Sequence, residues 1–426
     1  MIKKKEDTKE EFLENIKKIT DLINKNDNFF FYFSPDPDAV GVSIAFSLFL
    51  RQNYKDCVIF LPEGFDPNLD FLFDVASYNK IRIIKDVHKL KDILMQSKPV
   101  FVTCDTATHF LLPSFSEINK LKDEFCPKES IELDHHFGGD SEKIYEDSLT
   151  LFLKTNSSCE ILAEVFDEIG KFENKNIDYI FPRNIVLSLL IGICFDTQFG
   201  KFVVDKENYD KWYHFLSDRL KSITWGNPKY LNSSKQVFDA INKMSETKEK
   251  VLKYLVDTSR TKKKVGLLIL PPVGMYESLG PAGDSTCILS KIVTDLSNSL
   301  PEYAGRIGIL IFYDNLAKIY FLKIRRSFSY KDYDLRDLEV LLKEIFEKDY
   351  LGGGGHSGAT SFRINDIDRN DFIYKVEQFF DKVVEIITNL KNASIENNED
   401  SIKKKKKKKS KEDDIKKNKK KKKNKK

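Results

Sequence analysis

Residues 28–51, NFFFYFSPDPDAVGVSIAFSLFLR, pass from one apolar run through a proline-stiffened acidic loop into a second apolar run. The first run, Asn28–Phe33, is short and rich in aromatic residues, which is typical of a buried strand. Ala39–Arg51 has the length and spacing of a helix. A buried strand followed at once by a helix is the unit from which parallel sheets are built, so this stretch predicts an α/β fold.

The same alternation of short apolar runs and helical patterns continues to about residue 200. An amphipathic helix is expected over 8–25, before the first strand. Strands alternating with helices indicate a largely parallel sheet with helices on both faces. The further strands expected in this part are Cys57–Leu61, Ile81–Ile84, Pro99–Cys104 and Ser130–Leu133.

Changes of pattern divide the chain into four parts. We expect an N-terminal α/β domain over 1–202, which includes the first helix, and a helical, charged connector over 203–261. Strands and helices then return over 262–392, which predicts a second, smaller α/β domain. Residues 393–426 are rich in lysine and poor in apolar residues, so we expect a disordered tail.

Charge is unevenly distributed along the chain. The net charge is +4, yet residues 401–426 alone hold 17 lysines against three acidic residues, so the rest of the chain is net acidic. Two interpretations of the tail stay open: a solvated appendage, or an arm that makes weak contact with polyanions without reading their sequence.

Hydrophobic residues make up 41% of the chain, enough for a packed core. No apolar run reaches the ~20 residues that a membrane-spanning helix needs. The first ten residues are charged and lack the apolar centre of a secretory signal. We therefore expect a cytoplasmic protein with no membrane partner.

Acidic residues follow several of the expected strands. A single Asp in such a place is most often a helix cap or a turn residue. Because the carboxyl ends of parallel strands share one edge, several of them can meet in one cleft. The residues after strands are Asp36, Asp38, Asp105 and Asp134-His135-His136, and Asp196 follows the apolar stretch Leu187–Phe195, which is expected to be largely helical.

Clustered carboxylates repel one another unless a positive charge lies among them, and divalent cations supply it. Carboxylate together with imidazole suits manganese, iron or zinc, and magnesium fits where oxygen dominates. Two such ions can activate a water and stabilise a displacement at phosphorus. The pattern therefore points to metal-assisted hydrolysis of a phosphate ester.

A glycine run, Leu351-Gly-Gly-Gly-Gly-His356, is the second strong signal. Glycines leave bare backbone amides that can approach an anion, and His356 can bind a phosphate. The alternative is a flexible linker, but strand-like Thr360–Ile364 follows directly. Upstream, Arg326 lies in a basic strand end, where a guanidinium could hold phosphate oxygens or simply be solvated.

In this order, the motifs Pro-Asp-x-Asp-Ala, Asp-Thr-Ala, Asp-His-His, Asp-Thr and Gly-Gly-Gly-Gly-His resemble the DHH phosphoesterase superfamily. The resemblance covers about residues 28–200 and 262–365. It is strongest to members whose C-terminal domain carries GGGH. That group includes nanoribonuclease/pAp phosphatases and cyclic-dinucleotide phosphodiesterases.

The resemblance implies two manganese ions, with magnesium as an alternative. Asp36 would bind the first metal, Asp38 would bind the second, and Asp105 would bridge them. His135 and Asp196 would complete the second site.

The resemblance also implies roles around the metals. His136 would face the scissile phosphate, and Asp134 would orient the two histidines. The residues that would hold the substrate from the C-terminal domain are Arg326, Gly353, Gly354, Gly355 and His356.

In the family, a metal-binding His stands four residues before the first Asp. In this sequence that position is occupied by Tyr32. A phenol with a pKa of about 10 is a poor ligand near neutral pH, so the first metal site is expected to be weak.

The function that follows is hydrolysis of short oligonucleotides, dinucleotides or pAp in the cleft between the domains, with a homodimer as one option for assembly. The alternatives are a catalytically weakened nucleotide-binding protein and a cyclic-dinucleotide phosphodiesterase. A pyrophosphatase or polyphosphatase shares the N-terminal motifs, but the glycine run argues against it.

Overall fold

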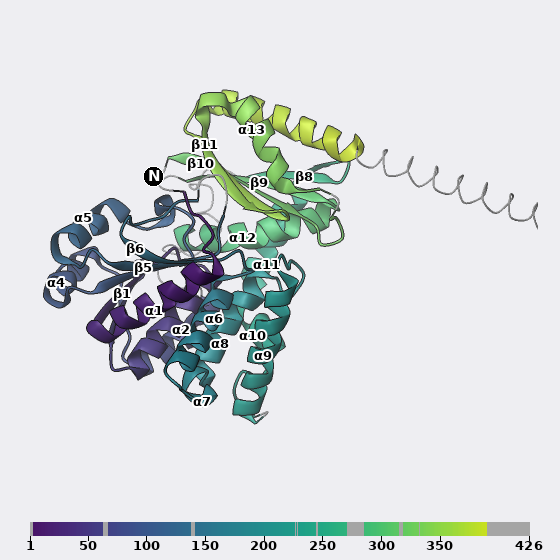
Figure 1. Ribbon diagram of the computed structural model, residues 1–426. Coiled ribbons are helices and arrows are strands. Elements are labelled where there is room, and N and C mark those ends of the chain that lie inside the picture. Colours follow the sequence, from purple (N-terminus) through teal and green to yellow (C-terminus); the bar gives the residue numbers. More distant parts are fainter. Residues whose placement is uncertain are drawn as a thin grey trace, which may run out of the picture.

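The computed structural model describes residues 3–62, 67–137, 141–225, 227, 229–243, 246–270, 285–314, 318–331 and 333–389. Its elements gather around two six-stranded sheets, one in the N-terminal and one in the C-terminal half (Figure 1). The lysine-rich segment 393–426 lies outside the described residues. Within the described part of the chain, no helix combines the length and apolarity needed to cross a bilayer.

The first sheet has the strand order β3-β2-β1-β4-β5-β6, and every neighbouring pair is parallel. The predicted parallel sheet is therefore confirmed. One strand, β6, was not expected from the sequence. The strands are β1 (Asn28–Tyr32), β2 (Asp56–Phe60), β3 (Arg82–Ile84), β4 (Val100–Cys104), β5 (Ser130–Asp134) and β6 (Ser148–Phe152).

Alternation along β1 sends its aromatic side chains to opposite faces of the sheet. Phe29 and Phe31 enter the larger core, which contains side chains of α1, α2, α6 and α8. Phe30 and Tyr32 enter a smaller core under α4 and α5. Helices thus cover both faces, as predicted. The helices are α1 (Lys9–Lys25), α2 (Pro37–Gln52), α3 (Asp70–Tyr78), α4 (Val87–Ser97), α5 (Phe115–Phe125), α6 (Ser158–Phe172), α7 (Ile177–Ile180) and α8 (Arg183–Asp196).

The helices expected to connect the domains are divided between the two cores. Trp212 of α9 (Lys206–Thr224) and Val237 of α10 (Ser234–Ile241) are buried in the larger core of the first sheet. Leu255, from α11 (Glu246–Asp257), packs instead against the second sheet.

The second sheet has the strand order β11-β12-β10-β9-β8-β7, with β8 and β9 parallel and the other pairs antiparallel. α11 and α12 (Ser285–Ala304) supply the core on one face, and α13 (Leu338–Phe346) and the helix over 369–389 supply it on the other (Figure 1). The second α/β unit is therefore confirmed. Its strands are β7 (Arg260–Lys262), β8 (Val265–Ile269), β9 (Ile307–Asp314), β10 (Ile319–Arg326), β11 (Tyr350–His356) and β12 (Ala359–Asn365).

The glycine run is a strand rather than a loop, which differs from the expectation of a bare anion-binding segment. It forms β11, at one edge of the second sheet, and pairs with β12. A Cβ added at Gly353 would lie 2.4 Å from the carbonyl oxygen of Ser361, and one at Gly355 would lie 2.2 Å from that of Ala359. The glycines are therefore required by the close approach of the two strands.

Glycine also sets the contact between α2 and α8, the two helices behind the acidic loop. A Cβ at Gly41 of α2 would lie 2.6 Å from the carbonyl oxygen of Ser188 in α8. A Cβ at Gly192 of α8 would lie only 1.9 Å from Oδ1 of Asp38 and 2.5 Å from Sγ of Cys159. The absence of a side chain at Gly192 thus leaves the space that the Asp38 carboxylate occupies.

We expect Gly192→Ala to lower the free energy of unfolding by about 2 kcal/mol or more, because the added methyl group overlaps the buried Asp38 carboxylate. Thermal unfolding followed by circular dichroism measures the change. Gly170→Ala is the control, since its Cβ would meet Ile180 at 3.0 Å and the carbonyl oxygen of Lys175 at 3.9 Å, and no residue of the acidic loop. Equal losses in the two variants would contradict the proposed role of Gly192.

Candidate metal centre

The chain order of the first sheet creates a crevice between β1 and β4. From β1 the chain fills one side of the sheet with β2 and β3, and then crosses over to β4, β5 and β6. Ligands of open parallel sheets bind at such a reversal, beyond the carboxyl ends of the strands. Asp36 and Asp38 follow β1, and Asp105 follows β4, so carboxylates flank this crevice on both sides.

Helix N-termini hold the two carboxylates that follow β1. Asp36 is the N-cap of α2 and accepts a hydrogen bond of 2.9 Å from the backbone N–H of Ala39. Asp38 is fully buried and accepts hydrogen bonds from the N–H groups of Ser158 (2.6 Å) and Cys159 (3.1 Å) at the start of α6. These N–H groups stabilise negative charge and hold the Asp38 carboxylate in place.

Asp105 is held in a conformation that non-glycine residues rarely adopt. Its φ angle is +49°, in the left-handed region. The backbone N–H of Asp105 donates to the carbonyl oxygen of Leu133 (2.8 Å), and the hydroxyl of Ser158 donates to its Oδ1 (2.8 Å). These contacts maintain the strained turn and direct the carboxylate toward the end of β5.

His135 lies buried between two of the predicted ligands. Its Nε2 is 3.3 Å from Oδ1 of Asp105 and 3.3 Å from Oδ2 of Asp196. Among the described residues, no group forms a hydrogen bond of acceptable geometry with this nitrogen. The other ring nitrogen, Nδ1, lies 3.3 Å from the carbonyl oxygen of Thr155. A buried, unpartnered imidazole nitrogen facing two carboxylates is what a metal ligand requires, with Nδ1 held from outside.

Asp134 holds the two histidines from behind. Its Oδ1 accepts hydrogen bonds from the backbone N–H groups of His135 (2.9 Å) and His136 (3.3 Å). The same oxygen lies 2.8 Å from Nδ1 of the His136 ring. The other carboxylate oxygen forms an ion pair with Lys4. Asp134 thus fixes the backbone after β5 and the direction of the His136 ring.

The charges of the cluster disfavour its fully ionised state. Burial raises the pKa of Asp36 and of Asp38 well above the ordinary value, and the nearby charges of Asp105 and Asp196 raise both further. Burial opposes ionisation of Asp105 as well, but the adjacent His135 and His136 hold its pKa below the ordinary value. The centre therefore carries unbalanced negative charge that a cation would neutralise.

Two sets of ligand atoms converge in this centre, with the atoms of each set within 4.8 Å of one another. One set consists of Asp38, His135 and Asp196, and the other of Asp105, His135 and His136. Asp36 belongs to neither set, but the charge of Asp105 and a hydrogen bond to it place Asp36 beside the second. Carboxylate and imidazole in these combinations fit manganese, iron or zinc, so the donor set is suited to divalent cations.

Tyr32 does not stand in a ligand position. Its ring packs in the smaller core with Phe30 and Phe60, and its hydroxyl donates to the carbonyl oxygen of Pro113 at 2.7 Å. Alternation along β1 turns the side chain toward α4 and α5, and burial raises its pKa. The residue thus belongs to the core of the sheet and offers no ligand to the centre, so the expectation of a weak first metal site stays a prediction.

The second domain brings an imidazole to this centre. The ring centroid of His356, at the end of β11, lies 5.5 Å from that of His135 and 6.2 Å from that of His136. Burial lowers the pKa of His356 to about 3, with a further contribution from the two neighbouring histidines. The edge strand formed by the glycines thus presents a neutral imidazole to the centre.

Alternation along β10 separates the basic residues. Arg326 donates to the carbonyl oxygens of Tyr333 (2.9 Å) and Lys331 (3.3 Å), within its own domain. Lys323 and Arg325 share the other face of the strand and interact electrostatically with the first domain, while Arg325 also donates to the carbonyl oxygens of Thr360 (3.0 Å) and Ile324 (3.1 Å).

Burial lowers the pKa of Lys323 to about 8, with a contribution from the Arg325 charge, while the charge of Asp36 opposes this shift. Burial lowers the pKa of Arg325 to about 10 against the influence of Asp196. Sequence reasoning selected Arg326 from this basic strand end and did not single out the pair. The alternation of Lys323, Ile324 and Arg325 could have revealed it.

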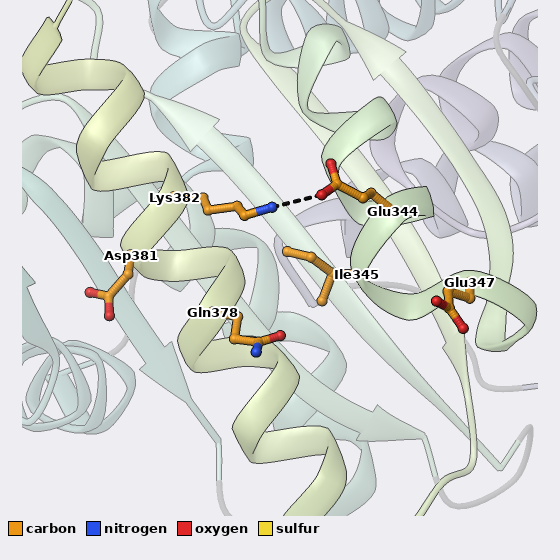
Figure 2. Close-up of a pocket in the computed structure, with 6 residues that line it drawn as sticks. All are labelled: Glu344, Ile345, Glu347, Gln378, Asp381 and Lys382. Carbon is orange, nitrogen blue, oxygen red and sulfur yellow. Dashed lines mark hydrogen bonds and ion pairs between the residues drawn. The ribbon is translucent and has the colours of Figure 1, made fainter.

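A shallow hollow of about 490 Å³ lies elsewhere, between α13 and the helix over 369–389 (Figure 2). Charged side chains line it, and Lys382 spans it to Glu344 at 2.9 Å. It brings together no nucleophile or ligand set, so the acidic centre is the better candidate for chemistry.

Fold and site together define a two-domain α/β protein with a candidate centre for divalent cations at a topological switch point. No protein-family model matches the chain. An uncharacterized protein of Methanocaldococcus jannaschii is 28% identical over 215 residues, which are 48% of this chain and 54% of that protein. The match therefore spans about half the length of this curated relative.

The crystal structure of an exopolyphosphatase-related protein from Bacteroides fragilis has a TM-score of 0.61 and 17% identity, over 88% of this chain and 98% of that chain. This likeness shows that the two proteins share their fold. RecJ from Thermus thermophilus in complex with Mn²⁺ has a TM-score of 0.38 and 13% identity, over 87% of this chain and 55% of that chain. At that score we draw no argument from it.

We expect Asp36→Asn to raise the thermal midpoint of the metal-free protein by about 2 °C or more. Asn caps a helix as well as Asp does, and the substitution removes a charge that burial and the neighbouring carboxylates disfavour. Because the folded-state pKa of Asp36 is raised, its ionisation costs stability as the pH rises, so the gain is larger near pH 8 than near pH 5. Differential scanning calorimetry in EDTA measures it.

The same variant should lose much of the stabilisation that Mn²⁺ gives to the wild-type protein. Asp86→Asn is the matched control, because Asp86 is an exposed N-cap of α4 that accepts from the N–H of His88 at 2.8 Å. It should change neither quantity. A lower midpoint for metal-free Asp36→Asn would contradict the repulsion described above.

Proposed function

We propose that this protein is a metal-dependent phosphoesterase that hydrolyses short oligonucleotides, dinucleotides or pAp between its two domains. One observation carries the proposal: Asp38, Asp105, His135 and Asp196, from four separate parts of the chain, converge within the first domain. The unpartnered Nε2 of His135 faces this acidic cluster. Burying several carboxylates together costs free energy. Such a cluster is therefore expected where it binds a cation.

The ligands of the proposed centre are Asp36, Asp38, Asp105, His135 and Asp196, with Asp105 proposed to bridge two cations. Divalent cations bound there, manganese or magnesium, would supply positive charge to a water and to phosphate oxygens. Asp134 orients His136, whose ring is partly exposed toward the second domain. His136 is thereby placed to hold or move a proton at the scissile phosphate.

The second domain offers the proposed substrate a basic surface. Lys323, Arg325 and His356 face the acidic centre from β10 and β11. A guanidinium and an ammonium next to a cation centre suit a substrate with two or more negative charges, such as a nucleotide with an additional phosphate. We infer that Arg325 contacts the substrate, and that Arg326, with Gly353, Gly354 and Gly355, maintains the strands that present it.

The name of the related Bacteroides fragilis structure adds inorganic polyphosphate to the substrates that need testing. The basic surface is compatible with that anion too. Retention of the carboxylates and histidines favours an enzyme over a binding protein that has lost its activity. The substrate is therefore best identified by testing all of these compounds in one panel of assays.

We expect the wild-type protein, in Mn²⁺, to hydrolyse at least one of a dinucleotide, a cyclic dinucleotide, pAp and polyphosphate, with products identified by mass spectrometry. Asp105→Asn should lower kcat on that substrate on the order of 1,000-fold, because the carboxylate proposed to bridge the two cations loses its charge. Asn tolerates the left-handed conformation of residue 105, so the fold should be kept.

Two results would contradict the proposal. One is a wild-type protein that binds Mn²⁺ and turns over none of the four substrates, which would favour the binding protein. The other is wild-type turnover in a correctly folded Asp105→Asn variant.

We expect Arg325→Met to raise KM on the preferred substrate about tenfold or more, because the proposed contact between guanidinium and phosphate is lost. Mn²⁺ affinity should stay the same or increase, since a positive charge near the centre is removed. Steady-state kinetics and calorimetric Mn²⁺ titration measure the two effects. Arg260→Met is a control, because Arg260 lies in β7 at the opposite edge of the same sheet, where its exposed guanidinium pairs with Glu377.

A further inference from the structure

An N-terminal strap, which we define as residues 3–8, runs beside β6 at the edge of the first sheet. The backbone N–H of Asp7 donates to the carbonyl oxygen of Phe152 (2.9 Å). Its carboxylate accepts from the N–H of Phe152 (2.8 Å) and the hydroxyl of Thr150 (3.1 Å). Lys3 forms an isolated bridge with Glu142. The strap is thus fastened on both sides of Lys4, to the segment before β6 through Lys3 and to β6 itself through Asp7.

Lys4 is the residue of the strap that reaches the metal centre. Only 1% of its side chain is exposed. The ammonium donates to Oδ2 of Asp134, to the carbonyl oxygen of Thr106, and to that of Ala107 at 3.4 Å. An ammonium group has three donors, and each of them has a partner here.

These partners belong to the two loops that carry the proposed ligands. Thr106 and Ala107 directly follow Asp105, whose left-handed conformation has to be maintained by its surroundings. Asp134 directly precedes His135 and His136 and accepts hydrogen bonds from both. Lys4 is therefore a single buried group that joins the carbonyls of one loop to the carboxylate of the other.

The positive charge of Lys4 pairs with the buried negative charge of Asp134. A buried carboxylate costs free energy unless it is paired, and Asp134 is 2% exposed. Without Lys4, the charge of Asp134 would be offset only by the histidines that are needed in the centre. The loop after Asp105 would also lose the donor to two consecutive carbonyls.

We propose that Lys4 is a positioning residue that holds Asp105 and the His135-His136 pair in ligand geometry by pairing with Asp134 and with the backbone after Asp105. The N-terminal strap is in this sense a part of the centre. This inference rests on the metal site of the proposed function.

The test is a calorimetric Mn²⁺ titration of the full-length protein without substrate. We expect Lys4→Met to bind Mn²⁺ about 10- to 100-fold more weakly than wild type, as is typical when a group supporting metal ligands is removed. The matched control is Asp7→Ala, which removes another side-chain anchor of the strap but no contact of the two loops. It should lower the thermal midpoint and leave Mn²⁺ affinity within about twofold.

A double-mutant cycle separates positioning from general loosening. If Lys4 acts through Asp134, Lys4→Met should weaken Mn²⁺ binding much less in an Asp134→Asn background than in the wild-type background. Full additivity of the two effects would overturn the proposed route. Should Lys4→Met fail to fold, Lys4→Gln keeps a side-chain donor without the charge, and the same weakening relative to Asp7→Ala is expected.

The outcomes distinguish the inference from the proposed function. A wild-type protein that binds no Mn²⁺ overturns the metal site itself and the inference with it. Wild-type binding together with unchanged affinity in the Lys4 variant overturns only the inference. Equal weakening in the Lys4 and Asp7 variants also overturns it, because the strap would then act on stability alone.

Discussion

The repulsion among carboxylates gathered at one edge of a sheet is the constraint on which the rest of this structure depends. Each carboxylate is held by a different favourable contact: Asp38 by the first N–H groups of α6, Asp105 by Ser158 and the histidines, and Asp134 by Lys4. These contacts orient the anions but leave excess negative charge, as the raised pKa of Asp36 and of Asp38 indicates. A divalent cation is the simplest group that removes such an excess.

The architecture explains why the charges can meet. Reversal of the strand order between β1 and β4 opens a crevice, and the loops after β1, β4 and β5 all end beside it. The tight packing of α8 on α2 through Gly192 places the end of α8, and with it Asp196, next to the same crevice. The second sheet then brings the neutral His356 and the basic Lys323 and Arg325 to this acidic centre. An acidic centre faced by basic groups is suited to anions that bind through metal ions.

Sequence patterns predicted the features that depend on residues close together in the chain. The alternation of apolar runs and helical periods predicted both α/β units, and the position of acids after strands predicted the set that converges. They were ambiguous for the glycine run, because a strand with closely spaced backbone and a loop with bare amides both favour glycine. They did not show that the side chain of Tyr32 enters the core, since its direction depends on which face of β1 it occupies. They also did not separate Arg325 from Arg326, because the two faces of β10 are assigned only by its pairing in the sheet.

By itself, then, the sequence determined the type of each element and the chemistry available at the strand ends, because apolar periodicity and residue type act over a few neighbours. Only the tertiary structure decided which of these groups meet. Lys4 lies in a charged stretch with no distinguishing pattern, yet it is buried against Asp134, 130 positions away. His356 and His135 are brought together from different domains in the same way. Such contacts are selected by the packing of whole layers, in which the burial of one charge depends on the position of every other.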